Sequence, residues 1–308
     1  MTDKTRIDVH QKVTDALIAQ IESTPGEWQL PWARPGVAFH IPENVTGRAY
    51  NGINIVSLWC AALDKGYPHH LWGTYRQWSD RKAQVRKGEK ASLVIFFKDF
   101  DVEIENTDTG ETEHETRMFA RASWAFNVAQ VDNYEVATIP PRPDLTERLD
   151  EVDRYIANTG AVIHHGHPMA CYRPGFDAIY MPDRSAFVAT ATSTPTESYY
   201  CTLSHELTHW TSIDKRCNRQ LGKRFGDDQY AIEELVAELG SAFLCAELGI
   251  TPSPRADHAQ YLAHWLTVLK ADKRAIFTAA AAASKAVAHL NGLQPKQPNQ
   301  TVSDAEAA

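Results

Sequence analysis

The sequence lacks an apolar run long enough to span a membrane, and no basic-then-apolar leader follows Met1. It also lacks any CxxC pair, and its cysteines are odd in number. These absences argue against a membrane protein, a disulfide framework and a thiolate zinc site. We therefore expect a cytoplasmic protein without membrane contact, whose cysteines are reduced core residues: Cys60, Cys171, Cys201, Cys217 and Cys245.

Positive charge is scarce as well, because 31 Lys and Arg against 39 Asp and Glu leave a net charge of −8. Taken alone, this balance argues against a nucleic-acid binder. The charge is unevenly spread, however, since residues 71–98 hold seven basic residues and two acidic ones, a local charge of +5. Residues 99–115 reverse the pattern with eight acidic residues and no Lys or Arg. The global charge therefore conceals a basic segment.

The most informative motif is His205-Glu206-Leu207-Thr208-His209. Thr194-Pro195-Thr196-Glu197 predicts the start of a helix over 194–211, with an N-cap threonine, proline at the first position and a capping-box glutamate. On one helix face the two histidines can bind one metal ion, while the glutamate takes a proton from metal-bound water. Such strings also arise by chance, but apolar flanking residues favour a buried active-site helix: Leu203, Leu207 and Trp210.

A second expected helix, from about Gln229 to Gly249, offers a third ligand. Glu234 and Glu238 share a face, while Glu233 lies about a hundred degrees round. We assign Glu234 as the ligand and Glu238 as the acceptor that orients a ligand histidine. The alternative is that the three glutamates lie on a solvent-exposed face, but the many apolar residues of this helix argue against it. We expect the cation to be Zn²⁺, or another divalent cation such as Mn²⁺. Three nearby histidines are expected to be exposed or to lie outside the ligand set: His164, His165 and His167.

This constellation predicts metal-promoted hydrolysis of a peptide bond. Glu206 is the expected catalytic base, accepting a proton and passing it to the leaving amine. An oxyanion donor is also required, and Tyr230 and Tyr180 are both open as candidates. In hydrolases of this kind a small sheet precedes the active-site helix, and its edge strand can bind an extended peptide.

Overall, the pattern predicts an α+β fold with two domains. Residues 1–140 are expected to hold helices over 8–23 and 51–64, a short helical stretch over 71–78, a strand over 91–97, and a hairpin of 101–105 with 117–131 around Asp108-Thr109-Gly110. A proline-rich linker at 141–143 follows. Residues 144–292 are expected to hold a helix over 145–158, strands over 161–164, 170–173 and 178–181, and further helices starting at Ser253 and Asp272. Residues 293–308 read as a disordered tail.

The N-terminal half interleaves aromatic side chains with basic ones, as a groove for single-stranded nucleic acid does. The aromatic faces would stack on bases and the cations would track phosphates. Core tryptophans and a solvated charged face are the alternative explanation on composition alone. The residues predicted to bind DNA are Arg48, Tyr50, Asn51, Trp72, Tyr75, Arg76, Trp78, Arg81, Arg86 and Lys87.

These pieces together resemble the ArdC-type antirestriction proteins of conjugative plasmids. The resemblance covers nearly the whole chain and rests on Trp28 with Pro31-Trp32, and on residues 44–54, 72–78, 85–89, 180–182, 203–211 and 233–239. Family members often continue after His-Trp-Thr with Gly-His, where this chain has Ser212-Ile213.

The resemblance implies an N-terminal domain that binds single-stranded DNA and a zincin-like metallopeptidase domain of the gluzincin type. It further implies that the protein protects incoming DNA from host restriction during conjugation. A host restriction-related protein would then be the peptidase target. Two alternatives stay open: a DNA-binding shield with a purely structural metal, and a peptidase unrelated to DNA protection.

Overall fold

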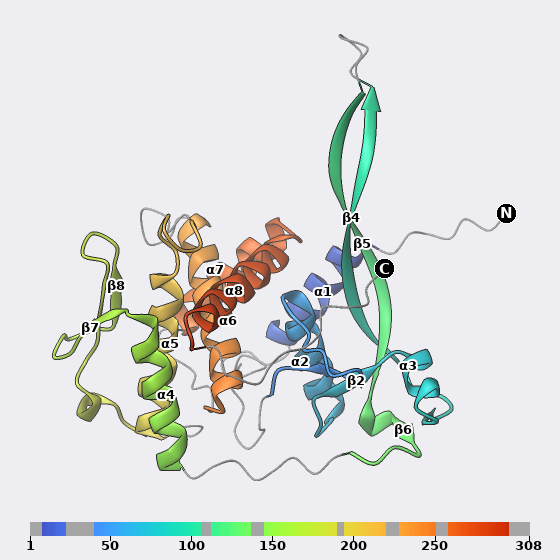
Figure 1. Ribbon diagram of the computed structural model, residues 1–308, viewed down its shortest axis with the longest axis horizontal. Helices are drawn as coiled ribbons and strands as arrows, with labels where there is room; N and C mark the ends of the chain where they lie inside the picture. The colour runs from blue at the N-terminus through green and yellow to red at the C-terminus, as the bar shows by residue number, and fades with distance from the viewer. Residues whose placement is uncertain are drawn as a thin grey trace.

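The computed structural model describes residues 8–22, 40–105, 112–136, 145–189, 194–219, 228–250 and 258–295. Figure 1 shows two regions side by side, an N-terminal one from which a long hairpin projects and a C-terminal one rich in helices. Both regions mix helices and strands, which confirms the predicted two-domain α+β fold. No helix of the described segments has the length and apolar character needed to cross a membrane.

The N-terminal region holds a four-stranded sheet of order β1-β2-β5-β4 and a small sheet of β3 and β6. Its elements are α1 (Val9–Glu22), β1 (Glu43–Asn44), α2 (Ile53–Lys65), β2 (Leu71–Gly73), α3 (Tyr75–Asp80), β3 (Gln84–Val85), β4 (Ser92–Glu105), β5 (Thr112–Asn127), η1 (Val128–Gln130) and β6 (Val131–Asp132). The two predicted helices at 8–23 and 51–64 are confirmed as α1 and α2. Gly66 ends α2 in the left-handed conformation that glycine adopts easily.

The predicted hairpin is confirmed and is longer than expected. β4 and β5 pair without interruption from Ser92↔Ala125 to Glu105↔Thr112. The predicted turn around Asp108 lies outside the described residues. Residues 128–130 were predicted as strand but form η1, because Asn127 and Gln130 make a reciprocal capping box that bends the chain.

The predicted helical stretch over 71–78 is wrong at its N-terminal end. Residues 71–73 form β2, which pairs with β1 and β5, and α3 begins only at Tyr75. The Thr74 hydroxyl accepts the Gln77 amide N–H at 3.2 Å, and the Gln77 side chain accepts the Thr74 N–H at 2.9 Å. This capping box sets the boundary between strand and helix.

The C-terminal region packs helices beside a three-stranded sheet of order β7-β9-β8. Its elements are α4 (Leu145–Thr159), β7 (Val162–His164), β8 (Cys171–Arg173), β9 (Ala178–Tyr180), η2 (Arg184–Ala186), α5 (Pro195–Trp210), α6 (Asp228–Leu248), α7 (His258–Ala271) and α8 (Ala275–Gly292). The predicted helix over 145–158 and the three predicted strands are confirmed. β8 pairs only with β9 within this sheet, so its other edge faces α5.

Some predicted features lie outside the described residues, namely the linker at 141–143 and the start of a helix at Ser253. Residues 293–295 of the predicted tail lie within the described part of the chain. The Gln294 side-chain amide donates to the Tyr155 and Leu290 carbonyls at 3.2 and 3.1 Å, and its oxygen accepts from Asn158. These bonds hold Gln294 against α4 and α8, and the rest of the predicted tail, 296–308, lies outside the described residues.

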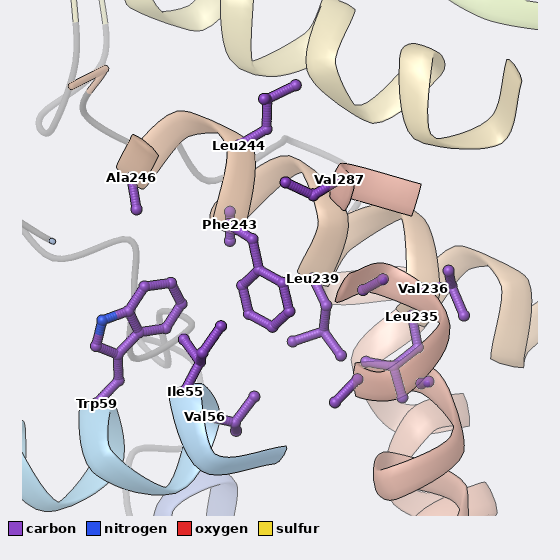
Figure 2. Packing of buried hydrophobic residues seen from close by; sticks show 14 of the residues in the cluster. Ile55, Val56, Trp59, Leu235, Val236, Leu239, Phe243, Leu244, Ala246 and Val287 are labelled. Carbon is purple, nitrogen blue, oxygen red and sulfur yellow. The ribbon is translucent and has the colours of Figure 1, made fainter. Parts of the chain in front are cut away.

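One hydrophobic core runs through both regions. Figure 2 shows Ile55, Val56 and Trp59 of α2 facing Leu239 and Phe243 of α6, and the Trp59 and Phe243 rings meet edge to face at 5.7 Å. The helix that carries the acidic motif of the C-terminal region therefore packs directly on the N-terminal region.

Candidate metal centre

The histidine motif lies in the last two turns of α5, where burial separates it from water. The predicted helix start is confirmed, since Thr194 and Glu197 form the capping box and Pro195 occupies the first turn. Within the motif, His205 and Glu206 are each 3% exposed. Their helix packs on α6 and on the small sheet, which explains why polar residues here are buried. Buried polar groups need partners, so this burial itself calls for an explanation.

Three side chains converge from the two helices. His205 Nε2 and His209 Nε2 lie 3.1 Å apart. Each is 3.5 Å from one oxygen of Glu234, His205 from Oε2 and His209 from Oε1. Among the described residues, these three form the one group of potential ligands close enough to share an ion. The structure thus brings together the predicted ligand set.

The spacing fits a divalent cation. Four ligands at 2.0–2.1 Å from a tetrahedral ion lie about 3.3 Å from one another. The separation of the two Nε2 atoms, 3.1 Å, and the approach of each to one Glu234 oxygen, 3.5 Å, are close to that value, and one ligand atom from each of the three residues lies within 4.8 Å of the others. Two imidazoles and one carboxylate are also the donor set of known catalytic zinc sites, which leave one position open. The residues present therefore fit a catalytic divalent metal.

Close approach of the two helices makes this convergence possible. A Cβ atom on Gly240 of α6 would lie 2.5 Å from Thr208 Cγ2 of α5. Thr208 lies inside the histidine motif and is fully buried. Only glycine leaves room here, so Gly240 sets the distance between the histidines and Glu234.

Carboxylates lie behind both ligand imidazoles. His205 Nδ1 is 3.4 Å from Glu238 Oε2, close enough for electrostatic attraction but without the geometry of a hydrogen bond, so the orienting role of Glu238 stays a prediction. His209 Nδ1 lies 3.2 Å from Glu233 Oε1, a role that sequence reasoning missed because Glu233 was weighed only as a rival ligand. Glu233 lies about a hundred degrees from Glu234 around α6, so its carboxylate meets Nδ1 of His209 and not the metal position. Each histidine thus presents Nε2 to the metal position.

These contacts shift the proton affinities of the metal-free site. Burial opposes protonation of His209, but hydrogen bonds to Glu233 and Glu234 outweigh it and raise the pKa of His209 to about 10. Burial likewise favours neutral carboxyl groups, yet the histidines hold the pKa of Glu234 far below its ordinary value. His209 and Arg219 lower the pKa of Glu233 in the same way. The site therefore holds negative charge that a proton or a cation must balance.

Glu206 points to the edge of the small sheet. Its Oε2 accepts the backbone N–H of Tyr172 in β8 at 2.8 Å. β8 is tied to the end of α5 by Arg216, which bonds to Asp177 and the Tyr172 hydroxyl and stacks 3.7 Å from the Trp210 ring centre. The predicted base thus lies between the metal ligands and a strand edge.

The nearby histidines make other contacts. His165 Nε2 bonds to the Tyr199 hydroxyl at 2.8 Å, and His167 bonds to Arg173 at 2.7 Å. The His164 ring packs on Tyr180, 5.1 Å between centres. None of the three belongs to the ligand cluster of the described residues.

The two tyrosines predicted as oxyanion donors occupy different places. Tyr180 lies in β9, where its ring is covered by the Arg173 guanidinium at 4.5 Å and by His167. Tyr230 lies one turn before Glu234 in α6 and so shares its face. Helical spacing therefore puts Tyr230 on the same side of α6 as Glu234, whereas the described contacts of Tyr180 are to Arg173, His164 and His167 around the sheet.

The ten residues predicted to bind DNA divide into two groups. Trp72, Trp78 and Tyr50 are 1%, 0% and 7% exposed, so they are core residues and their predicted stacking on bases is wrong. Trp72 is part of β2 within the sheet, and Trp78 is part of α3, which packs on β2 and β5. The other seven are exposed: Arg48, Asn51, Tyr75, Arg76, Arg81, Arg86 and Lys87.

Tyr75 is 54% exposed and stands beside a hollow of about 510 Å³ that Arg86 and Lys87 also line. Arg86 is partly neutralised there, because it bonds to Glu89 at 3.0 Å and to Asp132 at 3.4 Å. Two further exposed aromatics, Phe96 and Trp124, belong to the base of the hairpin and were not among the predicted residues. Exposed aromatic and cationic side chains thus remain in the N-terminal region after the buried ones are removed.

Comparison with known proteins agrees with this division of the chain. Residues 7–126 match the family model of the N-terminal domain of anti-restriction factor ArdC, and residues 150–282 match that of a zincin-like metallopeptidase. The chain is 42% identical over 288 residues to the uncharacterized protein y4eC of Sinorhizobium fredii, covering 92% of both. It is 35% identical to DNA primase TraC of Escherichia coli, of which it spans 27%.

Two solved structures are also similar. The metal-free crystal structure of the antirestriction ArdC protein from plasmid R388 superposes with a TM-score of 0.71 at 40% identity, covering 93% of this chain and 98% of that one. The Mn(II)-bound structure gives a TM-score of 0.71 at 38% identity with the same coverage. The chain therefore belongs to the ArdC family of antirestriction proteins, with an ArdC N-terminal domain followed by a zincin-like domain.

Proposed function

We propose that this protein binds single-stranded DNA through its N-terminal domain and hydrolyses peptide bonds at its metal centre, protecting incoming DNA from host restriction during conjugation. The observation that carries the enzymatic part is the convergence of His205, His209 and Glu234 with Glu206 beside them. The Mn(II)-bound structure of R388 ArdC supports a divalent metal in this family. Zn²⁺ is the cation we propose, with Mn²⁺ as the alternative.

The two histidines and Glu234 would hold the cation. When bound, the cation supplies Lewis acidity and lowers the pKa of water. Glu206 accepts the proton and returns it to the leaving amine, which its position next to the ligands allows. Tyr230, on the same face as Glu234, is the proposed donor to the developing oxyanion, and Tyr180 is the second choice.

Substrate alignment would come from β8. Its Tyr172 N–H points away from β9 and toward Glu206, so the backbone groups on this edge are directed to the metal centre. An extended peptide that adds to this edge by main-chain hydrogen bonds would take over the Tyr172 N–H and release the Glu206 carboxylate. A host restriction-related protein with an accessible extended segment is the proposed target.

DNA binding would use the exposed face around Tyr75. Its ring offers a stacking surface, and Arg76, Arg81 and Lys87 supply exposed cations near it in the chain. Stacking and phosphate contacts bind single strands without reading sequence. Arg48 and Asn51 belong to a separate exposed loop and are proposed as secondary contacts.

A DNA-binding shield with a structural metal is the second candidate. The hydrogen bond from Tyr172 to Glu206 favours it, because a carboxylate can also be buried to anchor a strand. Substitution E206Q separates the two, since it keeps the shape but removes the base. Under our proposal E206Q abolishes protection against restriction in cells while metal content and electrophoretic shift of single-stranded DNA stay unchanged. Full protection by E206Q would favour the shield.

A further inference from the structure

Arg219 lies behind the metal ligands, and nothing in its sequence context marks it. Its side chain is 10% exposed and follows α5 by nine residues. The guanidinium bonds Glu233 twice, from Nε at 3.0 Å and from Nη2 at 2.9 Å. This two-point pairing is the strong form of an arginine–carboxylate contact, and it fixes the plane of the Glu233 carboxylate.

The same guanidinium also binds the end of α5. Nη2 donates to the Thr208 carbonyl at 2.7 Å and Nη1 donates to the Thr211 hydroxyl at 2.8 Å. The Arg219 backbone N–H donates to the Ser212 carbonyl at 2.6 Å. Arg219 thus connects the helix that carries the histidines with the helix that carries Glu234.

Arg219 is linked to the metal position through Glu233 and His209. Glu233 Oε1 accepts from Arg219 and lies 3.2 Å from His209 Nδ1, and His209 Nε2 faces the other ligands. A carboxylate held in this way keeps the Nδ1 hydrogen on His209 and leaves the Nε2 lone pair for a cation. Without the arginine, Glu233 would be a buried carboxylate with one fewer partner and a free torsion.

We propose that Arg219 is a positioning residue of the metal centre, which orients His209 through Glu233 and holds α5 and α6 at the separation that the ligands need. The inference rests on the proposed metal site. It concerns affinity for the cation and the geometry around it, and Arg219 itself touches neither substrate nor metal.

The test is a Co²⁺ titration of the metal-free full chain, followed by visible absorption, which reports both affinity and coordination geometry. R219Q should weaken Co²⁺ binding by about 10- to 100-fold, the usual effect of removing a group that orients a ligand. R219K keeps the charge but loses the two-point pairing, so we expect an intermediate loss and an altered spectrum. E233Q should weaken binding as R219Q does, and the double variant should be no weaker than the worse of the two.

Arg216 supplies the matched control. Its side chain is 9% exposed and it too bonds a carboxylate and the end of α5, but that carboxylate belongs to Asp177 in the turn between β8 and β9. R216Q should therefore change Co²⁺ affinity by less than about threefold. If R219Q does not fold in a thermal melt followed by circular dichroism, R219K carries the test.

The outcomes separate the two proposals. Wild-type affinity and spectrum in R219K or R219Q would overturn the role of Arg219 while leaving the metal centre intact. Equal losses in R216Q and R219Q would overturn it as well, because the effect would then be general destabilisation. Failure of the wild-type protein to bind Co²⁺ would instead overturn the proposed metal site.

Discussion

The proposed metal ligands have side chains that are 4–12% exposed, whereas Arg76 on the proposed DNA face is 91% exposed. The first site lies between two packed helices, with Glu233 hydrogen-bonded behind His209. The second is a set of exposed cations around one exposed aromatic ring. A buried site of this kind has its geometry set before any ligand arrives, while an exposed one is ordered by the strand it binds. The predictions below test that contrast.

The largest difference is expected between substitutions of a buried and of an exposed aromatic residue in the N-terminal domain. Trp78 is fully buried and its indole N–H donates to the Phe126 carbonyl at 3.1 Å. W78A should lower the free energy of unfolding by about 3–5 kcal/mol, because it opens a large cavity. Y75A should cost less than about 1 kcal/mol of stability but weaken single-stranded DNA binding by about 1–3 kcal/mol.

Urea unfolding and electrophoretic shift measure the two effects. The contrast between core and binding face would be contradicted if W78A were as stable as the wild type. It would also fail if Y75A bound DNA normally at low salt.

The next largest effect on stability is expected where α5 and α6, the helices that carry the proposed ligands, pack against each other. G240A inserts a methyl group against Thr208, so we expect a loss of about 1–3 kcal/mol in unfolding free energy and weaker metal binding. G292A is the control, because a Cβ there meets nothing within 4 Å and the position lies in α8. Denaturant unfolding with and without metal measures both variants. Equal stability of G240A and G292A would contradict this prediction, because it would mean that α5 and α6 accommodate the added methyl group.

Metal affinity should rise with pH. The pKa of His209 in the metal-free protein is about 10, above the ordinary value of 6.5, so its proton stabilises the folded metal-free state fully below pH 6.5 and is lost as pH rises through 10. A cation must displace this proton at neutral pH. We expect affinity to increase by up to about tenfold per pH unit between pH 7 and 9. Competition titrations with a chelator of known pH dependence would measure it, and a flat profile would contradict the coupling.

The smallest effect should come from a single surface cation. R76Q should reduce the slope of log affinity for single-stranded DNA against log salt concentration by about 0.7, the value of one phosphate contact. R184Q is the control, because Arg184 is 54% exposed and pairs with Asp153 in the C-terminal region. An unchanged slope in R76Q would place the phosphate contacts elsewhere.

Sequence reasoning could identify the proposed metal ligands on α5 because helical geometry is local. Spacing of four residues places His205 and His209 on one face whatever the rest of the chain does. The capping residues around Thr194 and Pro195 likewise act within one turn. Glu234 could be selected because an acidic residue in an apolar helix needs a reason for being there.

Other features depend on tertiary packing and could not be predicted in this way. Trp72 and Trp78 have the composition of a stacking surface, and only the sheet behind them shows that they are buried. Arg219 contacts Glu233 across fourteen residues of sequence, with no periodic pattern to connect them. The capping box of Thr74 and Gln77 is a local signal in the sequence, and it places the start of the helix after residues 71–73.

The most direct test of the metal centre is metal content by mass spectrometry on the purified protein and on H205A. Our account predicts about one divalent ion per chain in the wild type and none in H205A, with single-stranded DNA binding retained by both. Absence of metal from the wild type after dialysis against Zn²⁺ and Mn²⁺ would contradict it, and would leave the N-terminal domain as the functional part of the protein.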